Sequence, residues 1–389
     1  MLFRLCQSPE LPVLFTERPN EAEARNKRLV QVPRLKEIVG TFGGCGHHCY
    51  SFFIALVLSG GGQIGILAVV LLLFICWFLR DNMREKDLRG KYIFITGCDS
   101  GFGNALAKHL DKEGFHVIAA CLSEEGSQEL EASTSLSLKT VVLNLTDSCS
   151  VDKAVEFVRA ETEGVGLYGL VNNAGRSMPM APTDWLQIEE FHKTLDVNLM
   201  GLIEITLKLL PLLKKSKGRI VNVSSVLGRL AFIGGGYCVS KWGVEAFSDS
   251  LRRDMHHFGV KVSIIEPGFF KTGVTNLEVI EIDLLRLWNQ LMPEVRDSYG
   301  DKYFVEYLKM QRLSMKKLCD PHLFKVTKCM EHALTAKYPR ARYGVGWDAK
   351  LLWLPLSYAP TFMSDMMLRM LFPVPAGRSN PASRFQIDV

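Results

Sequence analysis

A short apolar strand, a glycine-rich turn and a helix follow one another near residue 100, and this order limits the folds that the chain can adopt. The expected strand spans 92–96 and the expected helix 104–113. Three glycines lie in or beside the turn: Gly97, Gly101 and Gly103. Such glycines let the backbone approach a pyrophosphate, and the helix N-terminus stabilises its negative charge. We therefore predict the first strand–turn–helix unit of a dinucleotide-binding fold rather than an ordinary turn.

Strand and helix patterns alternate through the region from 88 to 345. Helical periods separate further short apolar strands, which are expected at 115–122, 139–145, 167–171, 218–223 and 260–265. Strands that alternate with helices form parallel sheets covered on both faces. The pattern predicts an α/β fold, a Rossmann-type doubly wound parallel sheet with helices on both faces.

A tyrosine and a lysine stand four residues apart at Tyr237 and Lys241, within an expected helix. Side chains at this spacing share one helix face. An unperturbed tyrosine has a pKa near ~10, which a neighbouring ammonium lowers, so the pair can take a proton from an alcohol. Ser225, at the end of the preceding strand, is placed to hold the substrate oxygen. The plain alternatives are a solvated lysine and a serine that serves only as a turn residue or cap.

Other small and polar residues follow the expected strands, where the carboxyl ends of parallel strands form ligand sites. Asn144 is placed to accept a hydrogen bond from an adenine amino group, and a simple turn residue fits equally well. Asn198 lies in a helical segment, 191–213, where asparagine has poor propensity. Two roles fit Asn198: its side chain holds a water beside Lys241, or it forms hydrogen bonds with backbone groups at a bend of the helix. Further candidates for cofactor contact, each of which also fits an ordinary turn, are Asn172, Ala174, Gly175, Pro267, Gly268 and Thr272.

The glycine turn and the second strand bear on the choice between NAD and NADP. The strand at 115–122 ends without an acidic residue for the ribose hydroxyls and without a basic residue for a 2′-phosphate. Asp99, beside Ser100 in the turn, would repel a 2′-phosphate because like charges disfavour each other. We therefore predict that Asp99 and Ser100 contact the cofactor and that NAD is preferred over NADP.

An uncharged apolar block precedes the α/β region. Residues 1–50 are polar, basic and irregular, so a poorly ordered extension is expected there. Residues 51–80 are expected to form a membrane anchor, because about 20 apolar residues span a bilayer. The alternative is a buried core helix, which the length and all-round hydrophobicity of the block disfavour. Basic residues are more numerous after the block than before it, which places the rest of the chain in the cytosol.

Two apolar stretches follow the last expected strand. Residues 273–318 are helical and rich in large apolar side chains, which suits a substrate lid, and ordinary amphipathic core is an equal alternative for any one residue. Residues 346–389 hold an apolar stretch that prolines and charges interrupt, and then a loose tail. They are expected to associate with the membrane surface rather than to span it.

Composition excludes several classes of function. A formal charge of +5 from 46 basic and 41 acidic residues is not typical of a nucleic-acid-binding protein. The ten cysteines are scattered through a long chain, which fits reduced thiols facing the cytosol. The segment from Cys45 to Cys49 lacks a second cluster to complete a tetrahedral site, so no metal is expected.

Taken in order and spacing, these motifs resemble the short-chain dehydrogenase/reductase family over about 88–360. The likeness is carried by TGCDSGFG, NNAG, YCVSK and PG, together with Asn198 and Ser225. Longer segments, such as GGGYCVSKWGVEAFSDSLRRDM and DAKLLWLPLSY, are similar to the microsomal retinol and 3α-hydroxysteroid dehydrogenases. Two departures are Asn144, where the family usually has aspartate, and the long N-terminal extension.

The resemblance implies roles for the candidate residues. Tyr237 would be the acid/base, Lys241 would lower its pKa and hold the nicotinamide ribose, and Ser225 would position the substrate oxygen. Asn198 would hold a relay water, and Thr272 would contact the carboxamide. The three turn glycines would cradle the pyrophosphate.

The resemblance further implies an NAD-dependent oxidation of lipid alcohols, all-trans-retinol or 3α-hydroxysteroids such as androstanediol, at the endoplasmic-reticulum membrane. The expected partners are the lipid alcohol, the bilayer and, by analogy, a second copy in a homodimer. Two other hypotheses stay open, an NADPH-dependent retinal or ketosteroid reductase and a non-catalytic membrane-bound scaffold. The intact set Ser225, Tyr237 and Lys241 disfavours the scaffold. Sequons at Asn144 and Asn222 fall on expected strand ends, which favours a cytosolic catalytic domain.

Overall fold

The computed structural model describes residues 62–375, with side chains from Leu67 onward. The predictions for 1–50, for most of the first half of the anchor at 51–80 and for the tail beyond 375 fall outside these residues. The chain divides into two units, Met1–Trp77 and Phe78–Val389. The second unit contains the α/β domain.

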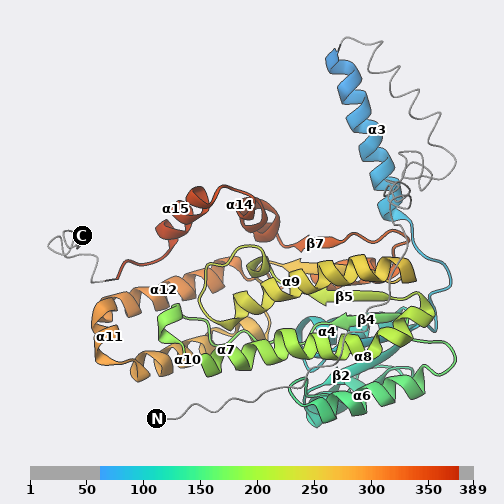
Figure 1. Cartoon of the computed structure of the whole chain (residues 1–389), viewed down its shortest axis with the longest axis horizontal. Coiled ribbons are helices and arrows are strands. Elements are labelled where there is room, and N and C mark those ends of the chain that lie inside the picture. The colour runs from blue at the N-terminus through green and yellow to red at the C-terminus, as the bar shows by residue number, and fades with distance from the viewer. Residues whose placement is uncertain (1–61, 376–389) are drawn as a thin grey trace, which may run out of the picture. The chain divides into compact units, whose positions relative to one another are not determined.

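A parallel sheet of seven strands forms the centre of the second unit, in the order β3-β2-β1-β4-β5-β6-β7 (Figure 1). All neighbouring strands run parallel. The strands are β1 (Tyr92–Thr96), β2 (His116–Cys121), β3 (Lys139–Val142), β4 (Gly169–Asn172), β5 (Arg219–Val223), β6 (Lys261–Pro267) and β7 (Arg342–Val345). The predicted doubly wound sheet is confirmed, but β7 was not among the predicted strands.

Helices cover both faces of the sheet. One face is covered by α4 (Gly101–Lys112), α5 (Glu124–Glu131) and α13 (Phe324–Thr335). The other face is covered by α6 (Ser148–Glu161), α8 (Gly201–Ser216) and α9 (Gly236–Met255). In β1, Ile93 and Ile95 pack into the first layer and Phe94 into the second. Burial on both sides explains why the strands are continuous apolar runs without alternation.

The predicted helical segment 191–213 is divided into three parts. Helix α7 (Ile188–Leu195) leads into a π-helical turn, η2 (Asp196–Met200), and α8 follows. Asn198 lies in the π-helical turn, where the regular ladder of helical hydrogen bonds is interrupted. The poor helical propensity of asparagine therefore coincides with a real irregularity of the backbone.

The predicted lid, 273–318, consists of a short turn and three helices. They are η5 (Gly273–Thr275), α10 (Leu277–Gln290), α11 (Pro293–Tyr299) and α12 (Asp301–Leu318). Their apolar sides meet in a cluster that also includes Trp185. In this cluster Trp288 stacks on Phe304 with ring centroids 4.8 Å apart. Aromatic pairing holds the lid helices together as one layer.

The chain after β7 continues through a π-helical turn, η6 (Ala349–Trp353), into α14 (Leu354–Ser357) and α15 (Thr361–Leu371). Trp353 is buried and stacks on Phe232. Large apolar side chains of α15 are instead exposed, namely Phe362, Met363, Met366, Met370 and Leu371. The C-terminal segment thus has one side packed on the domain and an apolar side facing outward.

Helix α3 (Gly62–Asn82) begins at the first described residue. Its large apolar side chains from Leu67 to Leu79 are mostly exposed. Judged over the described residues alone, no helix combines the length and the hydropathy needed to cross a membrane.

Candidate active site

A cavity of about 730 Å³ lies at the carboxyl ends of the central strands. Most of the predicted site residues line it: Gly97, Asp99, Ser100, Gly101, Asn144, Ala174, Gly175, Ser225, Tyr237, Lys241, Pro267, Gly268 and Thr272. Within the part of the chain that the structure describes, Gly103, Asn172 and Asn198 are the predicted residues outside this lining. The parallel sheet brings these distant segments together because all its strands end at the same edge.

Two glycines at the turn between β1 and α4, Gly97 and Gly103, have no room for a side chain. Gly97 has a φ of +71°, and a Cβ built on it would lie 2.7 Å from the Cα of Ala174. A Cβ on Gly103 would lie 2.2 Å from the carbonyl oxygen of Gly97. The turn is therefore closely packed under the cavity, with its backbone toward the space where a pyrophosphate would lie.

Asn173, rather than the predicted Asn172, ties the end of β4 to this turn. Its Nδ2 donates to the carbonyl oxygens of Thr96 and Gly97, both at 3.0 Å. Asn172 is buried one residue earlier and donates to Thr206 Oγ1 and Asn222 Oδ1, both at 2.8 Å. Successive residues of a strand point to opposite faces, so the two amides are separated. Asn173 supports the glycine turn, and Asn172 forms hydrogen bonds in the core.

Asp99 reaches from the glycine turn to the end of β2. Its carboxylate accepts from the backbone N–H of Leu122 at 2.9 Å and of Ser123 at 3.1 Å, and also from the Ser123 hydroxyl. Three donors hold the negative charge where an enzyme of this fold would bind the adenosine ribose. Ser100 is the N-cap residue of α4 and is exposed at the cavity.

Asn144 lies two residues beyond β3, which is shorter than predicted. Its Oδ1 accepts from the backbone N–H of Thr146 at 3.0 Å and from the Thr146 hydroxyl at 2.8 Å. This is the local turn that the sequence left open as an alternative. Asn144 still lines the cavity, with its oxygen engaged in the turn.

Tyr237, Lys241 and Ser225 meet at the start of α9. The Lys241 Nζ donates to the carbonyl oxygen of Val223, at the end of β5, over 2.9 Å. The same nitrogen lies 5.6 Å from the centre of the Tyr237 ring. Ser225 is buried beside them, and its hydroxyl also accepts from the backbone N–H of Leu227. The structure therefore assembles the predicted trio, with Ser225 contributed from outside the helix that carries the other two.

Burial drives both ionisable members of the trio toward their neutral forms. It raises the pKa of Tyr237 to about 12, and a hydrogen bond with Ser225 opposes that rise. It lowers the pKa of Lys241 to about 8, and the carboxylate of Glu245 opposes that fall. Each charged form is disfavoured in a low-dielectric environment. Proton exchange between these groups and a ligand therefore depends on the charges of their neighbours.

The Asn198 side chain is fully engaged with the protein. Its Oδ1 accepts from the backbone N–H of Arg176 at 2.8 Å, and its Nδ2 donates to the Arg176 carbonyl at 2.8 Å and to Ser240 Oγ at 3.0 Å. This matches the alternative in which asparagine satisfies the backbone at a bend. The amide joins the residues after Gly175 to α9, one residue before Lys241.

The residues after β6 form another wall of the cavity. Gly268 donates its N–H to the carbonyl oxygen of Val345, in β7, over 2.8 Å. Phe269 donates its N–H to Oδ2 of the buried Asp348 over 2.9 Å. Thr272 precedes η5, and its N–H donates to the Thr275 hydroxyl over 3.0 Å. Hydrogen bonds to Val345 and Asp348, in the C-terminal segment, thus fix the position of the Pro267–Gly268 turn.

Part of the cavity lining is apolar. It comes from several elements and includes Met178, Met180, Val226, Leu227, Phe269 and Met315. Met180 and Met315 also pack into the lid cluster. An apolar compartment next to a tyrosine and a serine hydroxyl suits an alcohol with a large apolar body.

Three residues of the site, Asn173, Phe269 and Asp348, were not predicted from the sequence. Asn173 carried a signal, because it repeats the amide of Asn172 on the opposite side of the strand. Phe269 and Asp348 carried none, since their importance depends on the contact between β6 and the segment after β7.

Metal binding was also considered. Across the residues with described side chains, no group of acidic, histidine or cysteine side chains is arranged to hold a metal ion. The segment from Cys45 to Cys49, for which no metal was expected, lies outside those residues.

Residues 91–280 match the short chain dehydrogenase family. The chain is 51% identical to human retinol dehydrogenase 5 over 80% of its own length and 98% of that protein. It is 53% identical to mouse retinol dehydrogenase 16, covering 78% of this chain and 95% of that one. It is 50% identical to a bovine short-chain dehydrogenase/reductase, family 9C member 7, over 77% of this chain and 95% of the relative.

Among solved structures, a short-chain dehydrogenase/reductase from Burkholderia phymatum in complex with NAD superposes with a TM-score of 0.57 at 21% identity, covering 73% of this chain and 97% of that one. A short-chain dehydrogenase from Streptomyces avermitilis gives a TM-score of 0.56 at 24% identity, over 72% and 94% of the two chains. At this level of identity the two structures support the fold.

Proposed function

The chain belongs to the short-chain dehydrogenase family of oxidoreductases, and from that premise we propose that it oxidises lipid alcohols by hydride transfer to NAD. One observation carries the proposal: Tyr237, Lys241 and Ser225 converge between the glycine turn and an apolar compartment in one cavity. A nucleotide and an apolar alcohol can therefore meet at the proton-handling group that the mechanism needs.

The cavity fits a nicotinamide dinucleotide. At Gly97 and Gly103 any Cβ would collide with neighbouring protein atoms, so these glycines permit the tight turn and the close packing of the helix that a dinucleotide fold needs, and Gly101 lines the cavity itself. In the proposal, these glycines with Gly101 hold the pyrophosphate, and Ala174 and Gly175 line the path toward the nicotinamide. Pro267, Gly268 and Thr272 support the nicotinamide end. The bound dinucleotide would accept the hydride, and the protein supplies orientation and proton handling.

The proton is handled by the trio at the start of α9. Ser225 holds the alcohol oxygen next to the Tyr237 hydroxyl, whose pKa the Ser225 hydroxyl lowers against the effect of burial. Tyr237 in its phenolate form takes the alcohol proton. Lys241 makes that form accessible, since a nearby ammonium stabilises a phenolate and offsets the effect of burial. Asn198 holds the backbone after Gly175 against α9 through its side chain.

We propose NAD rather than NADP because of Asp99. Its carboxylate is fixed by backbone N–H groups at the end of β2, where the adenosine ribose would lie. A 2′-phosphate there would face a fixed negative charge, whereas ribose hydroxyls could donate to it. The reverse activity, an NADPH-dependent reduction of retinal or a ketosteroid, is disfavoured because Leu122 and Ser123 offer that phosphate no cation.

The substrate proposed first is all-trans-retinol, with 3α-hydroxysteroids such as androstanediol as the second candidate. The relatives named as retinol dehydrogenases share about half of their sequence with this chain over nearly their whole length. The methionine-rich lining of the cavity can adapt to either a polyene or a ring system. The apolar lining therefore supports the substrate class, and turnover must rank the two alcohols.

A location on the endoplasmic-reticulum membrane, with the catalytic domain in the cytosol, is also proposed. It is supported by two apolar surfaces, the exposed side chains of α3 and those of α15. Exposed apolar patches of this size mark contacts with lipid or protein. A homodimer is also proposed, since α8 and α9 expose large apolar side chains, among them Leu207 and Trp242.

The test uses microsomes that carry the full chain, with retinol or androstanediol and either dinucleotide. We expect NAD-dependent oxidation of at least one alcohol, followed by nicotinamide fluorescence. Tyr237→Phe should abolish turnover while nucleotide binding persists. Tyr338→Phe, which removes an exposed hydroxyl on the surface, is the matched control and should keep full activity. Full turnover by Tyr237→Phe would overturn the mechanism, and activity with NADP alone would overturn the role of Asp99.

A further inference from the structure

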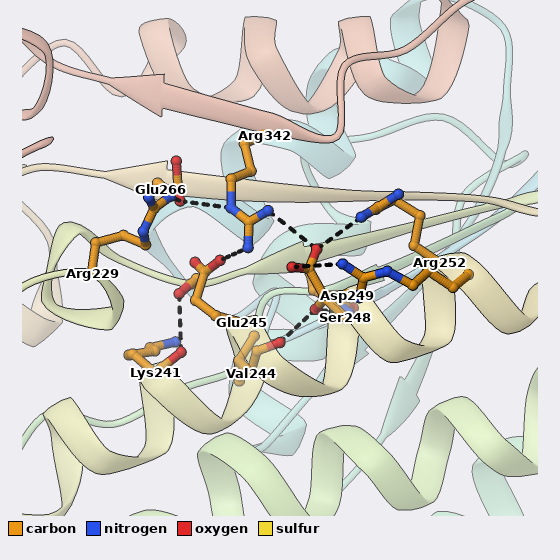
Figure 2. Close-up of polar contacts among 12 residues, drawn as sticks. Arg229, Lys241, Val244, Glu245, Ser248, Asp249, Arg252, Glu266 and Arg342 are labelled. Carbon is orange, nitrogen blue, oxygen red and sulfur yellow. Dashed lines mark hydrogen bonds and ion pairs between the residues drawn. The ribbon is translucent and has the colours of Figure 1, made fainter. Parts of the chain in front are cut away.

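A largely buried charge cluster follows Lys241 along α9 (Figure 2). Its centre is Arg342, which reaches from β7 to α9 and β6. Arg342 donates to Glu245 over 2.8 Å and to Asp249 over 3.1 Å, and its Nε lies 3.3 Å from a Glu266 oxygen. One guanidinium therefore joins three carboxylates from two elements.

Two of these carboxylates are almost inaccessible to water. Glu245 is 6% exposed and Glu266 is 2% exposed. Buried carboxylates are costly unless cations and hydrogen bonds compensate them. Arg229 supplies a second cation to Glu266 over 2.9 Å. The cluster thus contains the positive charge that two buried carboxylates need in order to stay ionised.

Glu245 is placed one helical turn after Lys241 on α9. Residues at this spacing are neighbours on one helix face. Lys241 is itself 4% exposed, and its ammonium donates a hydrogen bond to the neutral carbonyl of Val223. A neutral acceptor does not balance a buried charge. The carboxylate of Glu245 is the group that favours the ammonium of Lys241 against the effect of burial.

We propose that Glu245 is a positioning residue for the reaction, whose buried carboxylate, held by Arg342 of β7, keeps the Lys241 ammonium charged beside Tyr237. This inference rests on the roles proposed above for Tyr237 and Lys241. It connects the last strand of the sheet to the proton-handling group through one shared ion cluster.

The electrostatic surroundings of Glu245 are well defined. Burial and the charge of Glu266 raise its pKa, whereas the nearby Ser224 hydroxyl and the guanidinium of Arg342 lower it. The charged and titratable groups that face it come from every neighbouring element: Arg342 on β7, Glu266 on β6, Arg229 after η3 (Val226–Gly228), and Lys241 and Asp249 on α9. The cations in this set compensate the repulsion between the two buried carboxylates.

Loss of the Glu245 charge has a predictable sign. Removing a negative charge favours deprotonation of every neighbouring group. Lys241, one helical turn away, would then lose its proton at a lower pH, and the support that its ammonium gives the Tyr237 phenolate would be lost with it. The fall of alcohol oxidation on the alkaline side of the pH profile should therefore begin at a lower pH when the carboxylate is neutralised.

The experiment compares Glu245→Gln with the wild-type full chain in microsomes, using retinol and NAD from about pH 6 to about pH 10. We expect the fall of kcat at alkaline pH to begin about one pH unit lower, the size that a nearby charge typically produces. Arg342 keeps Asp249 and Glu266 as partners in this variant, so the fold should survive. Glu245→Asp retains the charge, and its profile should stay with the wild type.

Asp249→Asn is the matched control. It also removes a carboxylate that binds Arg342, but this carboxylate is partly exposed and about 12 Å farther along α9 from Lys241. Its pH profile should not move. A lower rate with an unchanged profile for Glu245→Gln, or an equal shift for Asp249→Asn, would overturn the proposal. If Tyr237→Phe were active, the proposed function itself would fail, and the two failures are therefore distinguishable.

Discussion

On the nucleotide side of the cavity, main-chain groups and glycines hold the turn between β1 and α4, whereas on the lid side aromatic and methionine side chains fill the space. A single Cβ at Gly103 would meet a backbone oxygen at 2.2 Å. In the lid, Trp288 and Phe304 lie in van der Waals stacking, and side chains of this kind can be exchanged or reoriented. The nucleotide side therefore suits a cofactor of constant structure, which a fixed backbone holds. The lid side suits substrates of variable shape, which adaptable side-chain packing holds.

The largest effect is expected for Gly103→Ala, on the nucleotide side. A Cβ there must displace the Gly97 carbonyl and so move the turn that we propose holds the pyrophosphate, and NAD affinity should fall by about 100-fold, which corresponds to roughly 3 kcal/mol. Titration of protein fluorescence with NADH measures it. Gly164→Ala is the control: a Cβ there has no neighbours within 4 Å, so strain at its positive φ should lower stability without changing NADH affinity. Equal NADH affinity in Gly103→Ala would contradict the packed-turn description.

Lys241→Met tests the junction between the two sides. Loss of the ammonium removes a charge that stabilises the Tyr237 phenolate, so the pKa of Tyr237, which burial already raises, should rise further. Oxidation requires the deprotonated tyrosine, so the rise of kcat with pH should move to higher pH, and kcat at neutral pH should fall about 100-fold. A pH–rate profile measures both. An unchanged profile would remove Lys241 from the proton-handling group.

Met180→Ala addresses the lid side, where Met180 lines the cavity and is buried against the lid cluster. Loss of most of a buried methionine side chain removes about 1.5 kcal/mol or more of apolar contact, so KM for retinol should rise about tenfold. NADH affinity should remain within about twofold. Steady-state kinetics with each ligand varied in turn separate the two effects, and a loss of NADH affinity of similar size would erase the distinction between the sides.

The smallest effect is expected for Asp99→Asn. The amide keeps an acceptor for the backbone N–H of Leu122 or Ser123 but removes the negative charge near the ribose. The preference for NAD over NADP, measured as the ratio of kcat/KM values, should fall by about tenfold, a little more than 1 kcal/mol. A ratio that does not change would place the discrimination elsewhere on the nucleotide side.

The two sides also differed in how well the sequence predicted them. The glycine turn, Asp99, Tyr237 and Lys241 follow from local spacing, because each motif lies within one short segment of the chain. The lid was predicted only as an apolar helical region, and which of its side chains face the cavity could not be obtained from periodicity. The roles of Asn144 and Asn198 were each left between two alternatives, and in both cases the side chain bonds to nearby protein groups.

The strand β7 shows the limit of local patterns most clearly. Its four residues include Arg342 and Gly344, and only Tyr343 and Val345 are buried. A short edge strand with a charged residue carries little strand signal by itself. It forms because β6 offers an unpaired edge, and its position brings Arg342 onto the carboxylates of α9 and β6.

The α/β class, the position of the nucleotide turn and the identity of the tyrosine–lysine pair could all be obtained from the sequence, because they depend on residues close together in the chain. The tertiary structure was needed to show which of two neighbouring asparagines supports the turn and which side chains line the apolar compartment. It was also needed to show that a strand near the C-terminus supplies the cation behind Lys241. Those features depend on the parallel sheet, which ends all its strands at one edge and so places residues from distant segments in contact. Local spacing carries no information about such contacts, and burial then sets the charge states of the groups that meet there.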